Sequence, residues 1–329
     1  MDVMFYEVFK EEEKALKLFL PKDVFAEFTS KTIQAQADKK PPASLISIRT
    51  QSVIPDEWKD KLEGVLTRSV GYEHLLEYMQ KNEALFLAGY LPSYCARAVA
   101  EHAVMAMLML LRKAGRQLEQ FDSFNRDGLT GRECSGKNLL VLGVGRIGSQ
   151  LVDLGRGLKM TVKGVDIQEK LPELEYVPLS KGLEWADVVV CALPLTNETK
   201  GMLDYKTFSS VKKGAVFVNI SRGDISPLKD LSRLLEEGRL GGISLDVYEK
   251  ESSLAECLRG NAVEETGLAE EVMELKKHPN VLLTPHNAFN TEEALERKAE
   301  QSIESVQLFL QKKTFPYPVP EWQPDVFKI

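Results

Sequence analysis

Residues 137–166 read KNLLVLGVGRIGSQLVDLGRGLKMTVKGVD, and this stretch decides the fold. An apolar run leads into the spacing G-x-G-x-x-G, which is made by Gly143, Gly145 and Gly148. A helical pattern and a second apolar run follow, and the second run ends at Asp166. Strand, tight turn, helix, strand and acid in this order are typical of the βαβ unit that binds a dinucleotide.

Each glycine of this motif has its own physical role. Gly143 lets the backbone turn sharply, Gly145 lets a pyrophosphate approach the main chain, and Gly148 lets helix and strand pack closely. The amide groups at the helix N-terminus, together with the helix dipole, then favour the phosphates. We therefore assign five residues of the turn to the cofactor site: Gly143, Gly145, Arg146, Ile147 and Gly148.

The acid that closes the unit indicates which dinucleotide binds. Asp166 lies 18 residues after Gly148, where a carboxylate can accept hydrogen bonds from a ribose diol. The same charge would repel a 2′-phosphate, so the sequence favours NAD over NADP. The glycine spacing alone is a weak signal, because the chain holds 22 glycines and the motif could be an ordinary turn. The flanking strand, helix and acid make it specific.

The size and charge of the chain narrow the class of protein. With 329 residues, two domains are the default. Hydrophobic residues make up 43% and charged residues 28%, as in soluble globular proteins. The net charge of −7 argues against a nucleic-acid or anionic-membrane partner. The longest apolar run, residues 103–111, is far shorter than the roughly 20 residues that span a bilayer.

The N-terminal segment and the cysteines predict a cytoplasmic protein. The segment MDVMFYEVFKEEEK has no basic region followed by an apolar core, so we expect no secretory signal. The four cysteines are widely separated, with no C-x-x-C and no metal-like Cys/His spacing. We therefore expect reduced, mostly buried thiols and neither a disulfide nor a metal site.

Strand and helix patterns alternate along the rest of the chain, which predicts parallel α/β domains. Before the dinucleotide unit, strands are expected at residues 1–9, 24–28, 44–49 and 64–67, and helices at 10–20, from Pro55 and at 98–118. After it, strands are expected at 187–193, 215–220, 242–245 and 281–284, and helices at 227–238 and 291–312. Residues 250–280 form an acidic, helix-like insertion, and residues 314–329 an extended tail.

Chemically useful side chains follow several of these strands. Ligands of parallel sheets bind beyond the carboxyl ends of the strands. Five residues follow such ends in the predicted order: Asp166, Pro194, Arg222, Asp246 and His286. The sequence therefore places its candidate site at one edge of a sheet.

Six ordered segments resemble the D-2-hydroxyacid dehydrogenase family, and the resemblance covers nearly all of the chain. They read SVGYEHL (69–75), AVAEH (98–102), GVGRIG (143–148), NISRGD (219–224), LDVYEKE (245–251) and TPHNAF (284–289). The glycine motif alone fits many dehydrogenases. The ordered set of six is much more restrictive.

The resemblance implies three catalytic residues, Arg222, Glu251 and His286. Their chemistry suits a 2-oxo acid, because a guanidinium can hold both its carboxylate and its carbonyl. Hydride from the nicotinamide then leaves an alkoxide, to which an imidazolium can give a proton near neutral pH. A carboxylate beside that imidazole favours its charged form and fixes its tautomer. Glu249 competes for this role, but the spacing from Asp246 favours Glu251.

The resemblance also implies binding residues. Asp246 matches a position near the nicotinamide, where it would hold the carboxamide, and Pro194 and Thr199 are assigned to the cofactor as well. Val70 and Gly71 match a loop whose backbone amides bind the substrate carboxylate. For the remaining polar residues of these motifs we expect no direct part in the reaction: Arg68 and His74 on the surface, and His102 in a structural role.

Within the family, the chain is most similar to the D-lactate dehydrogenase branch. That branch carries A-Y-S-P before the linking helix, where this chain reads Ser93-Tyr94-Cys95-Ala96, and its H-x-A-F is intact at residues 286–289. Tyr94 and Phe289 would wall a pocket sized for a small side chain such as the methyl of pyruvate. The change to Cys95-Ala96 leaves the exact substrate open. The sequence indicates neither the physiological direction nor the role of residues 250–280.

We therefore predict an α/β protein with two Rossmann-like, doubly wound parallel-sheet domains and an interdomain cleft. Residues 1–100 and 289–329 would form the substrate domain, and residues 101–288 the NAD domain. A homodimer would reversibly reduce a small 2-oxo acid, with pyruvate favoured, to the D-2-hydroxy acid. The alternatives are glyoxylate, hydroxypyruvate or a bulkier 2-oxo acid as substrate, or an NAD(H)-sensing, corepressor-like binding protein without turnover.

Overall fold

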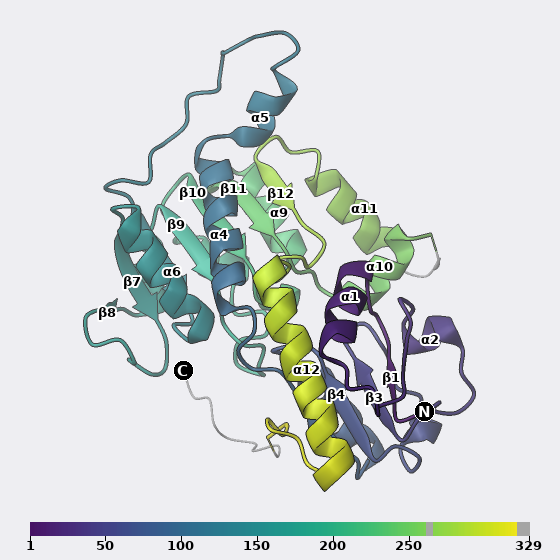
Figure 1. Cartoon of the computed structure of the whole chain (residues 1–329). Helices are drawn as coiled ribbons and strands as arrows, with labels where there is room; N and C mark the ends of the chain where they lie inside the picture. Colours follow the sequence, from purple (N-terminus) through teal and green to yellow (C-terminus); the bar gives the residue numbers. More distant parts are fainter. Residues whose placement is uncertain (261–265, 321–329) are drawn as a thin grey trace. The chain divides into compact units, whose positions relative to one another are not determined.

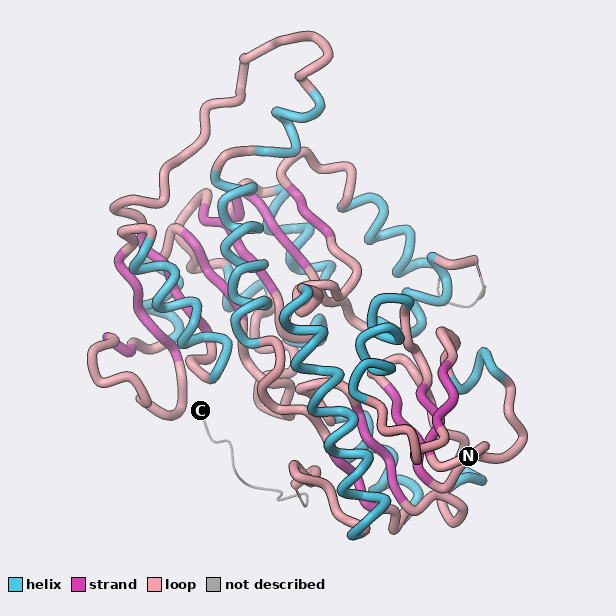
Figure 2. Tube along the Cα trace, in the orientation of Figure 1, coloured by secondary structure: helices cyan, strands magenta, loops and turns pink. Residues whose placement is uncertain are grey.

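The computed structural model describes residues 1–260 and 266–320, which form two compact units (Figure 1). The first unit contains Met1–Cys95 and the described residues from Asn290 onward, and the second contains Ala96–Phe289. Each unit holds one sheet in which every pair of neighbouring strands is parallel. Helices alternate with the strands along the chain, as Figure 2 shows. The predicted α/β parallel-sheet fold is confirmed.

The first unit has a five-stranded sheet in the order β2-β1-β3-β4-β5. Its strands are β1 (Val3–Phe5), β2 (Ala26–Phe28), β3 (Leu45–Ile48), β4 (Gly64–Thr67) and β5 (Leu87–Gly89). Its helices are α1 (Lys10–Phe19), α2 (Ile33–Gln36), the 3-10 turn η1 (Asp56–Trp58), α3 (Glu73–Asn82) and α12 (Glu292–Lys312). All residues of β3 and β4 are buried, as expected for parallel strands covered on both faces.

Helix α12 brings the C-terminal part of the chain onto this sheet, where it packs on α1 and β4. Thr291 caps its first turn by accepting a hydrogen bond from Ala294 N. The approach to β4 needs a residue without a side chain, because a Cβ at Gly64 would lie 2.3 Å from the Phe309 ring. The first unit is thus assembled from two distant parts of the sequence.

The second unit has a seven-stranded sheet in the order β12-β11-β10-β9-β6-β7-β8. Its strands are β6 (Asn138–Leu142), β7 (Thr161–Val165), β8 (Glu175–Tyr176), β9 (Val188–Cys191), β10 (Ala215–Asn219), β11 (Leu240–Leu245) and β12 (Val281–Leu283). Its helices are α4 (Ala96–Leu111), α5 (Ala114–Glu119), α6 (Arg146–Gly157), α7 (Leu179–Trp185), α8 (Tyr205–Phe208), the 3-10 turn η2 (Gly223–Ile225), α9 (Leu228–Glu236), α10 (Glu251–Leu258) and α11 (Thr266–Leu275). The strand order reverses between β6 and β9, the place where such sheets bind ligands.

Two sequence-based expectations need correction. The single helix predicted over residues 98–118 is two helices, because Lys113 adopts a left-handed backbone with φ of +53° and α5 starts a new direction. The helix expected from Pro55 is only the 3-10 turn η1. The insertion over residues 250–280 contains α10 and α11, but residues 261–265 lie outside the described chain, as do residues 321–329 of the predicted tail.

The interior of the second unit explains why its strands are so apolar. β9 and β10 are buried at every position, between helices such as α4 and α9.

All four cysteines are free thiols: Cys95, Cys134 and Cys191 are buried and Cys257 is half-buried. Within residues 1–260 and 266–320, no helix is long and apolar enough to cross a membrane.

Candidate active site

The turn from β6 into α6 has the geometry that its glycines predict. Gly143 has φ of +85°, and a Cβ there would lie 2.8 Å from Ala192 O. A Cβ at Gly148 would lie 2.0 Å from Gly143 O, so helix and turn touch through backbone alone. At Gly145, no described atom outside its own stretch of chain comes within 4 Å of the position that a Cβ would take. The open space at the start of α6 fits a pyrophosphate.

Asp166 is hydrogen-bonded to this same turn. Its Oδ2 accepts a hydrogen bond of 2.6 Å from Val144 N, and its Oδ1 accepts one of 2.9 Å from Gln168 N. The two bonds fix the direction of the half-buried carboxylate at the end of β7. Each oxygen can accept more than one hydrogen bond, so the carboxylate can still receive the hydroxyls of a ribose diol.

Thr199 closes the loop that follows β9. Its hydroxyl donates to Pro194 O at 2.7 Å and accepts from Thr196 N at 2.8 Å, and the residue is only 3% exposed. Its side chain is therefore engaged within the loop that carries Pro194. Thr199 therefore fixes the shape of this loop through the carbonyl oxygen of Pro194, which lies in the segment after β9.

His286 and Glu251 meet in the second unit. His286 Nδ1 lies 2.6 Å from Glu251 Oε1, and the two side chains are 26% and 21% exposed. An ionised carboxylate only accepts hydrogen bonds, so Nδ1 carries the proton of this contact and Nε2 is the nitrogen left for a reacting group. His286 follows β12 with a left-handed backbone, φ of +50°, which is uncommon outside glycine. Strained backbone of this kind occurs at functional sites.

Glu249, the competitor for this role, points elsewhere. Its Oε2 accepts a hydrogen bond of 2.8 Å from Leu228 N and so caps the start of α9. Glu251 begins α10 directly after Lys250, whose left-handed backbone turns the chain. The turn separates two carboxylates that are only two residues apart, and it brings Glu251 to the imidazole.

Asp246 holds the segment that carries His286. It is 1% exposed, and its carboxylate accepts hydrogen bonds from Thr284 Oγ1 (2.6 Å), Asn287 N (2.8 Å) and Ala288 N (2.9 Å). Its own carbonyl accepts from His286 N at 2.9 Å. Asp246 therefore binds the chain on both sides of His286 as well as the backbone of His286 itself. Its carboxylate thus supports the segment around His286. The contact with the nicotinamide carboxamide stays a prediction.

His102 of α4 supports the same segment, in keeping with the structural role expected for it. Its Nε2 lies 3.2 Å from Thr284 Oγ1 and 3.9 Å from Asp246 Oδ1. Burial lowers the pKa of His102, and the Asp246 carboxylate opposes this effect. The neutral imidazole is thus favoured against Thr284.

Arg222 follows β10 in a turn fixed by Asn219. The Asn219 amide donates to Arg222 O at 3.0 Å and to Ser226 Oγ at 2.9 Å, while its oxygen accepts from Ser221 N. A Cβ at Gly223 would lie 1.9 Å from Tyr248 C, so only glycine lets this turn lie against the segment before Glu251. The spacing N-x-x-R-G therefore has a local cause, and it presents a half-buried guanidinium at the strand end.

The first unit contains three further predicted substrate residues, Val70, Gly71 and Tyr94. In the loop after β4, Ser69 Oγ donates to Gly71 O at 2.6 Å, and Ser69 O accepts from Leu91 N at 3.1 Å. Within the described chain the amides of Val70 and Gly71 donate no hydrogen bond, as a carboxylate-binding loop requires. Tyr94 is 4% exposed, and burial raises its pKa well above the ordinary value. Phe289 belongs to the second unit and is 6% exposed.

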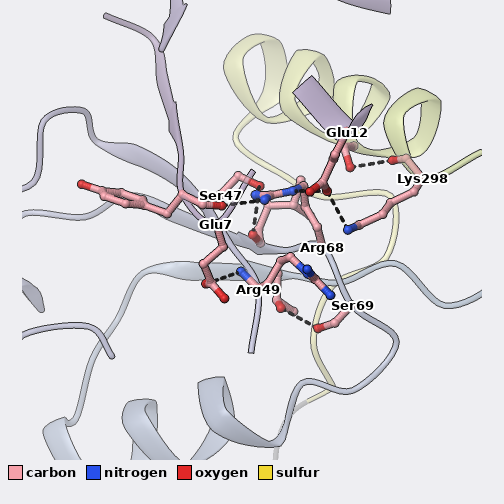
Figure 3. Close-up of polar contacts among 11 residues, drawn as sticks. Glu7, Glu12, Ser47, Arg49, Arg68, Ser69 and Lys298 are labelled. Carbon is pink, nitrogen blue, oxygen red and sulfur yellow. Dashed lines mark hydrogen bonds and ion pairs between the residues drawn. The ribbon is translucent and has the colours of Figure 1, made fainter. Parts of the chain in front are cut away.

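The surface role expected for Arg68 is wrong. Its side chain is 0% exposed and lies in a group of buried charges with Glu12 and Lys298 (Figure 3). His74, expected on the surface, is half-buried. Within residues 1–260 and 266–320, no group of three or more His, Cys, Asp or Glu side chains could hold a metal ion.

Comparison with known proteins identifies the family. Residues 104–288 match the family model described as D-isomer specific 2-hydroxyacid dehydrogenase, NAD binding domain. The chain belongs to this family. The D-isomer specific 2-hydroxyacid dehydrogenases act as NAD-dependent oxidoreductases, and the matched residues include the G-x-G-x-x-G turn, Arg222, Glu251 and His286.

Relatives of this dehydrogenase carry different names. The 2-hydroxyacid dehydrogenase A of Aspergillus oryzae is 34% identical over 268 residues, which are 80% of this chain and 76% of that protein. An aromatic 2-oxoacid reductase of Clostridium sporogenes is 31% identical over 255 residues, 75% of this chain and 76% of that protein. The crystal structure of D-lactate dehydrogenase from Aquifex aeolicus, complexed with NAD and lactic acid, has a TM-score of 0.81 and 29% identity, covering 96% and 99% of the two chains.

Proposed function

We propose that this dehydrogenase catalyses the reversible, NADH-dependent reduction of a small 2-oxo acid to the D-2-hydroxy acid, with pyruvate as the favoured substrate. The observation that carries this proposal is the His286–Glu251 contact of 2.6 Å, held at a strand end by Asp246. A histidine oriented in this way can give a proton to a forming alkoxide and take it back in the reverse reaction.

Each remaining residue supports one part of this reaction. NAD, when bound, supplies or accepts the hydride, and the turn at Gly143–Gly148 with Asp166 would hold it. The Arg222 guanidinium would bind the carboxylate and the carbonyl oxygen of the substrate with its fixed donors. The amides of Val70 and Gly71 would bind the same carboxylate from the first unit. His286 Nε2 would donate the proton, and Glu251 would stabilise the charged imidazole.

The size of the substrate side chain is the finer part of the proposal. We assign Tyr94 and Phe289 to binding of the substrate side chain, and two such large residues would favour a small group such as methyl. The aromatic 2-oxoacid reductase among the relatives supports the alternative of a bulkier acid. Glyoxylate and hydroxypyruvate remain the small alternatives.

A substrate panel tests the proposed function. The kcat/KM for NADH-dependent reduction of pyruvate, glyoxylate, hydroxypyruvate and phenylpyruvate is measured under one set of conditions, and pyruvate is expected to give the highest value. A higher value for phenylpyruvate would favour the bulkier alternative. A protein that binds NADH but reduces none of these acids would refute the enzyme and favour an NAD(H)-sensing binding protein.

We also propose that the chain forms a homodimer through α4. Met105 and Leu108, three residues apart on this helix, are 42% and 37% exposed, so they share one apolar surface. Large exposed apolar side chains that lie together are typical of protein interfaces. Sedimentation equilibrium should give twice the chain mass of 36.9 kDa. The variant Leu108→Glu should give the single mass if α4 lies in the interface.

A further inference from the structure

The first unit contains a buried charge cluster made of Glu12, Arg68 and Lys298 (Figure 3). Glu12 lies in α1, Arg68 follows β4 and Lys298 lies in α12. The side chains are 1%, 0% and 1% exposed. Glu12 Oε1 lies 3.0 Å from Arg68 Nε and 2.6 Å from Lys298 Nζ. Two cations therefore share one carboxylate oxygen in the interior of the unit.

The Arg68 guanidinium is held from several directions. Beside its contact with Glu12, Nη1 donates to Ser47 Oγ at 3.0 Å and Nη2 donates to Tyr6 O at 2.6 Å. The backbone N of Arg68 donates to Ile48 O at 2.8 Å. A planar fork with donors in fixed directions can satisfy these partners together, which a single ammonium cannot. Arg68 is thereby fixed to α1, to β3 and to Tyr6, the residue that follows β1.

Arg68 is joined by one peptide bond to the loop of Ser69, Val70 and Gly71. Inside this loop, the Ser69 hydroxyl bonds to Gly71 O and Thr67 Oγ1. These contacts occupy the hydroxyl and a carbonyl of the loop and leave the amides of Val70 and Gly71 for a ligand. The loop begins directly after Arg68, whose side chain is fixed by Glu12, Ser47 and Tyr6. The direction of the Val70 and Gly71 amides therefore depends on the position of Arg68.

Stability alone is a poor explanation for this cluster. Burying charges is expensive, and apolar side chains of similar volume are often as stabilising as a buried ion pair. Glu12 Oε2 adds to the cost, because it has no hydrogen-bond partner within the described chain. Arg68 and Ser69 directly follow the carboxyl end of β4, and ligands of parallel sheets bind beyond such strand ends.

We propose that Arg68 is a positioning residue: clamped by Glu12, Ser47 and Tyr6, and with Lys298 bound to the same carboxylate, it holds the Ser69–Gly71 loop so that the amides of Val70 and Gly71 face the substrate carboxylate. This inference rests on the proposed function. It assigns Glu12 and Lys298, which touch no reacting group, to the support of substrate binding.

The variant Arg68→Lys tests the inference. It keeps the charge in place but removes the fork. The KM for the preferred 2-oxo acid should rise roughly tenfold, equivalent to about 1.4 kcal/mol, while the dissociation constant of NADH stays unchanged. The affinity of the NADH complex for oxamate, a carboxylate that is not reduced, should fall by the same factor. The oxamate measurement separates binding of the carboxylate from the chemical step.

A second variant and a matched control keep the test decisive. Glu12→Gln removes the shared charge but keeps an oxygen for Arg68, so a smaller rise in KM is expected, and this variant decides the test if Arg68→Lys does not fold. Lys313→Met removes an exposed ion pair between α12 and Glu63, and it should leave KM unchanged.

Two results would overturn the inference. One is a folded variant with unchanged KM and unchanged oxamate affinity. The other is an equal loss of NADH affinity, which would indicate general damage to the protein. Failure of the proposed function is distinguishable from both, because the unmodified protein would then reduce none of the acids in the panel.

Discussion

Glu251→Gln removes the charge beside His286 and almost nothing else. The contact that it weakens is 2.6 Å long and joins side chains that are 21% and 26% exposed. Hydrogen bonds to charged groups contribute about 1.5–3 kcal/mol. At 1.36 kcal/mol per factor of ten, kcat for reduction should fall roughly 10- to 100-fold, because the protonated imidazole loses its carboxylate. Binding of NADH should not change, since Glu251 is not among the residues assigned to the cofactor.

Glu249→Gln is the matched control for this prediction. The same substitution lies two residues away, and the glutamine oxygen can still accept the hydrogen bond from Leu228 N. Steady-state kinetics at saturating NADH, with thermal unfolding of both variants, completes the assay. If Glu249→Gln reduced kcat as much as Glu251→Gln, or if neither variant did, the assignment of Glu251 would be refuted.

Three further predictions follow from the structure. His286→Ala should remove most turnover while the dissociation constant of NADH stays nearly the same; substantial residual kcat would count against its acid–base role. Asp166→Ala should weaken NAD more than NADP, because the carboxylate is proposed to bind the ribose diol and would repel a 2′-phosphate. An unchanged preference would mean that Asp166 does not set cofactor choice. Burial lowers the pKa of Lys298 from 10.5 to about 7, opposed by Glu12 and aided by Arg49 and Arg68. Between about pH 7 and 10, Lys298 has lost its proton in the folded chain but keeps it in the unfolded chain. The free energy of unfolding should therefore rise with pH over this range. Urea unfolding of Lys298→Met should lack this rise; a parallel pH dependence in both proteins would show that Lys298 is not its source.

The dinucleotide unit could be predicted almost residue by residue because its signals are local. The glycine spacing, the apolar runs and the closing acid all lie within residues 137–166, and they correspond to β6, α6 and β7. The contact between Glu251 and His286 joins residues 35 apart, and only the family resemblance paired them in advance. The structure adds the cause, which is the left-handed turn at Lys250.

The features that could not be predicted depend on tertiary contacts or on weak local signals. The one glycine near the break between α4 and α5, Gly115, lies inside α5, so it does not mark the left-handed turn at Lys113. The partners of Asp246 come from a segment about 40 residues later in the chain. The burial of Arg68 could not be predicted, because its partner Glu12 lies 56 residues earlier in the chain and Lys298, which contacts the same carboxylate, lies 230 residues later.

One sequence signal could have revealed the buried charge cluster. Lys298 falls between Leu295 and Ser302 on the buried face of α12, and Glu12 lies four residues before the buried Leu16 of α1. A charged residue at a core position of a helix needs a partner, because an isolated buried charge is costly. Glu12 and Lys298, which have opposite charges, would therefore have suggested a buried ion pair. The sequence does not indicate that Arg68 joins this pair.

The most direct test of the central claim is the configuration of the product. The purified protein is incubated with NADH and the 2-oxo acid of highest kcat/KM, and the hydroxy acid is separated on a chiral column. One mole of the D-2-hydroxy acid should form for each mole of NADH consumed. Formation of the L-enantiomer, or no hydroxy acid from any member of the panel, would contradict the proposed function.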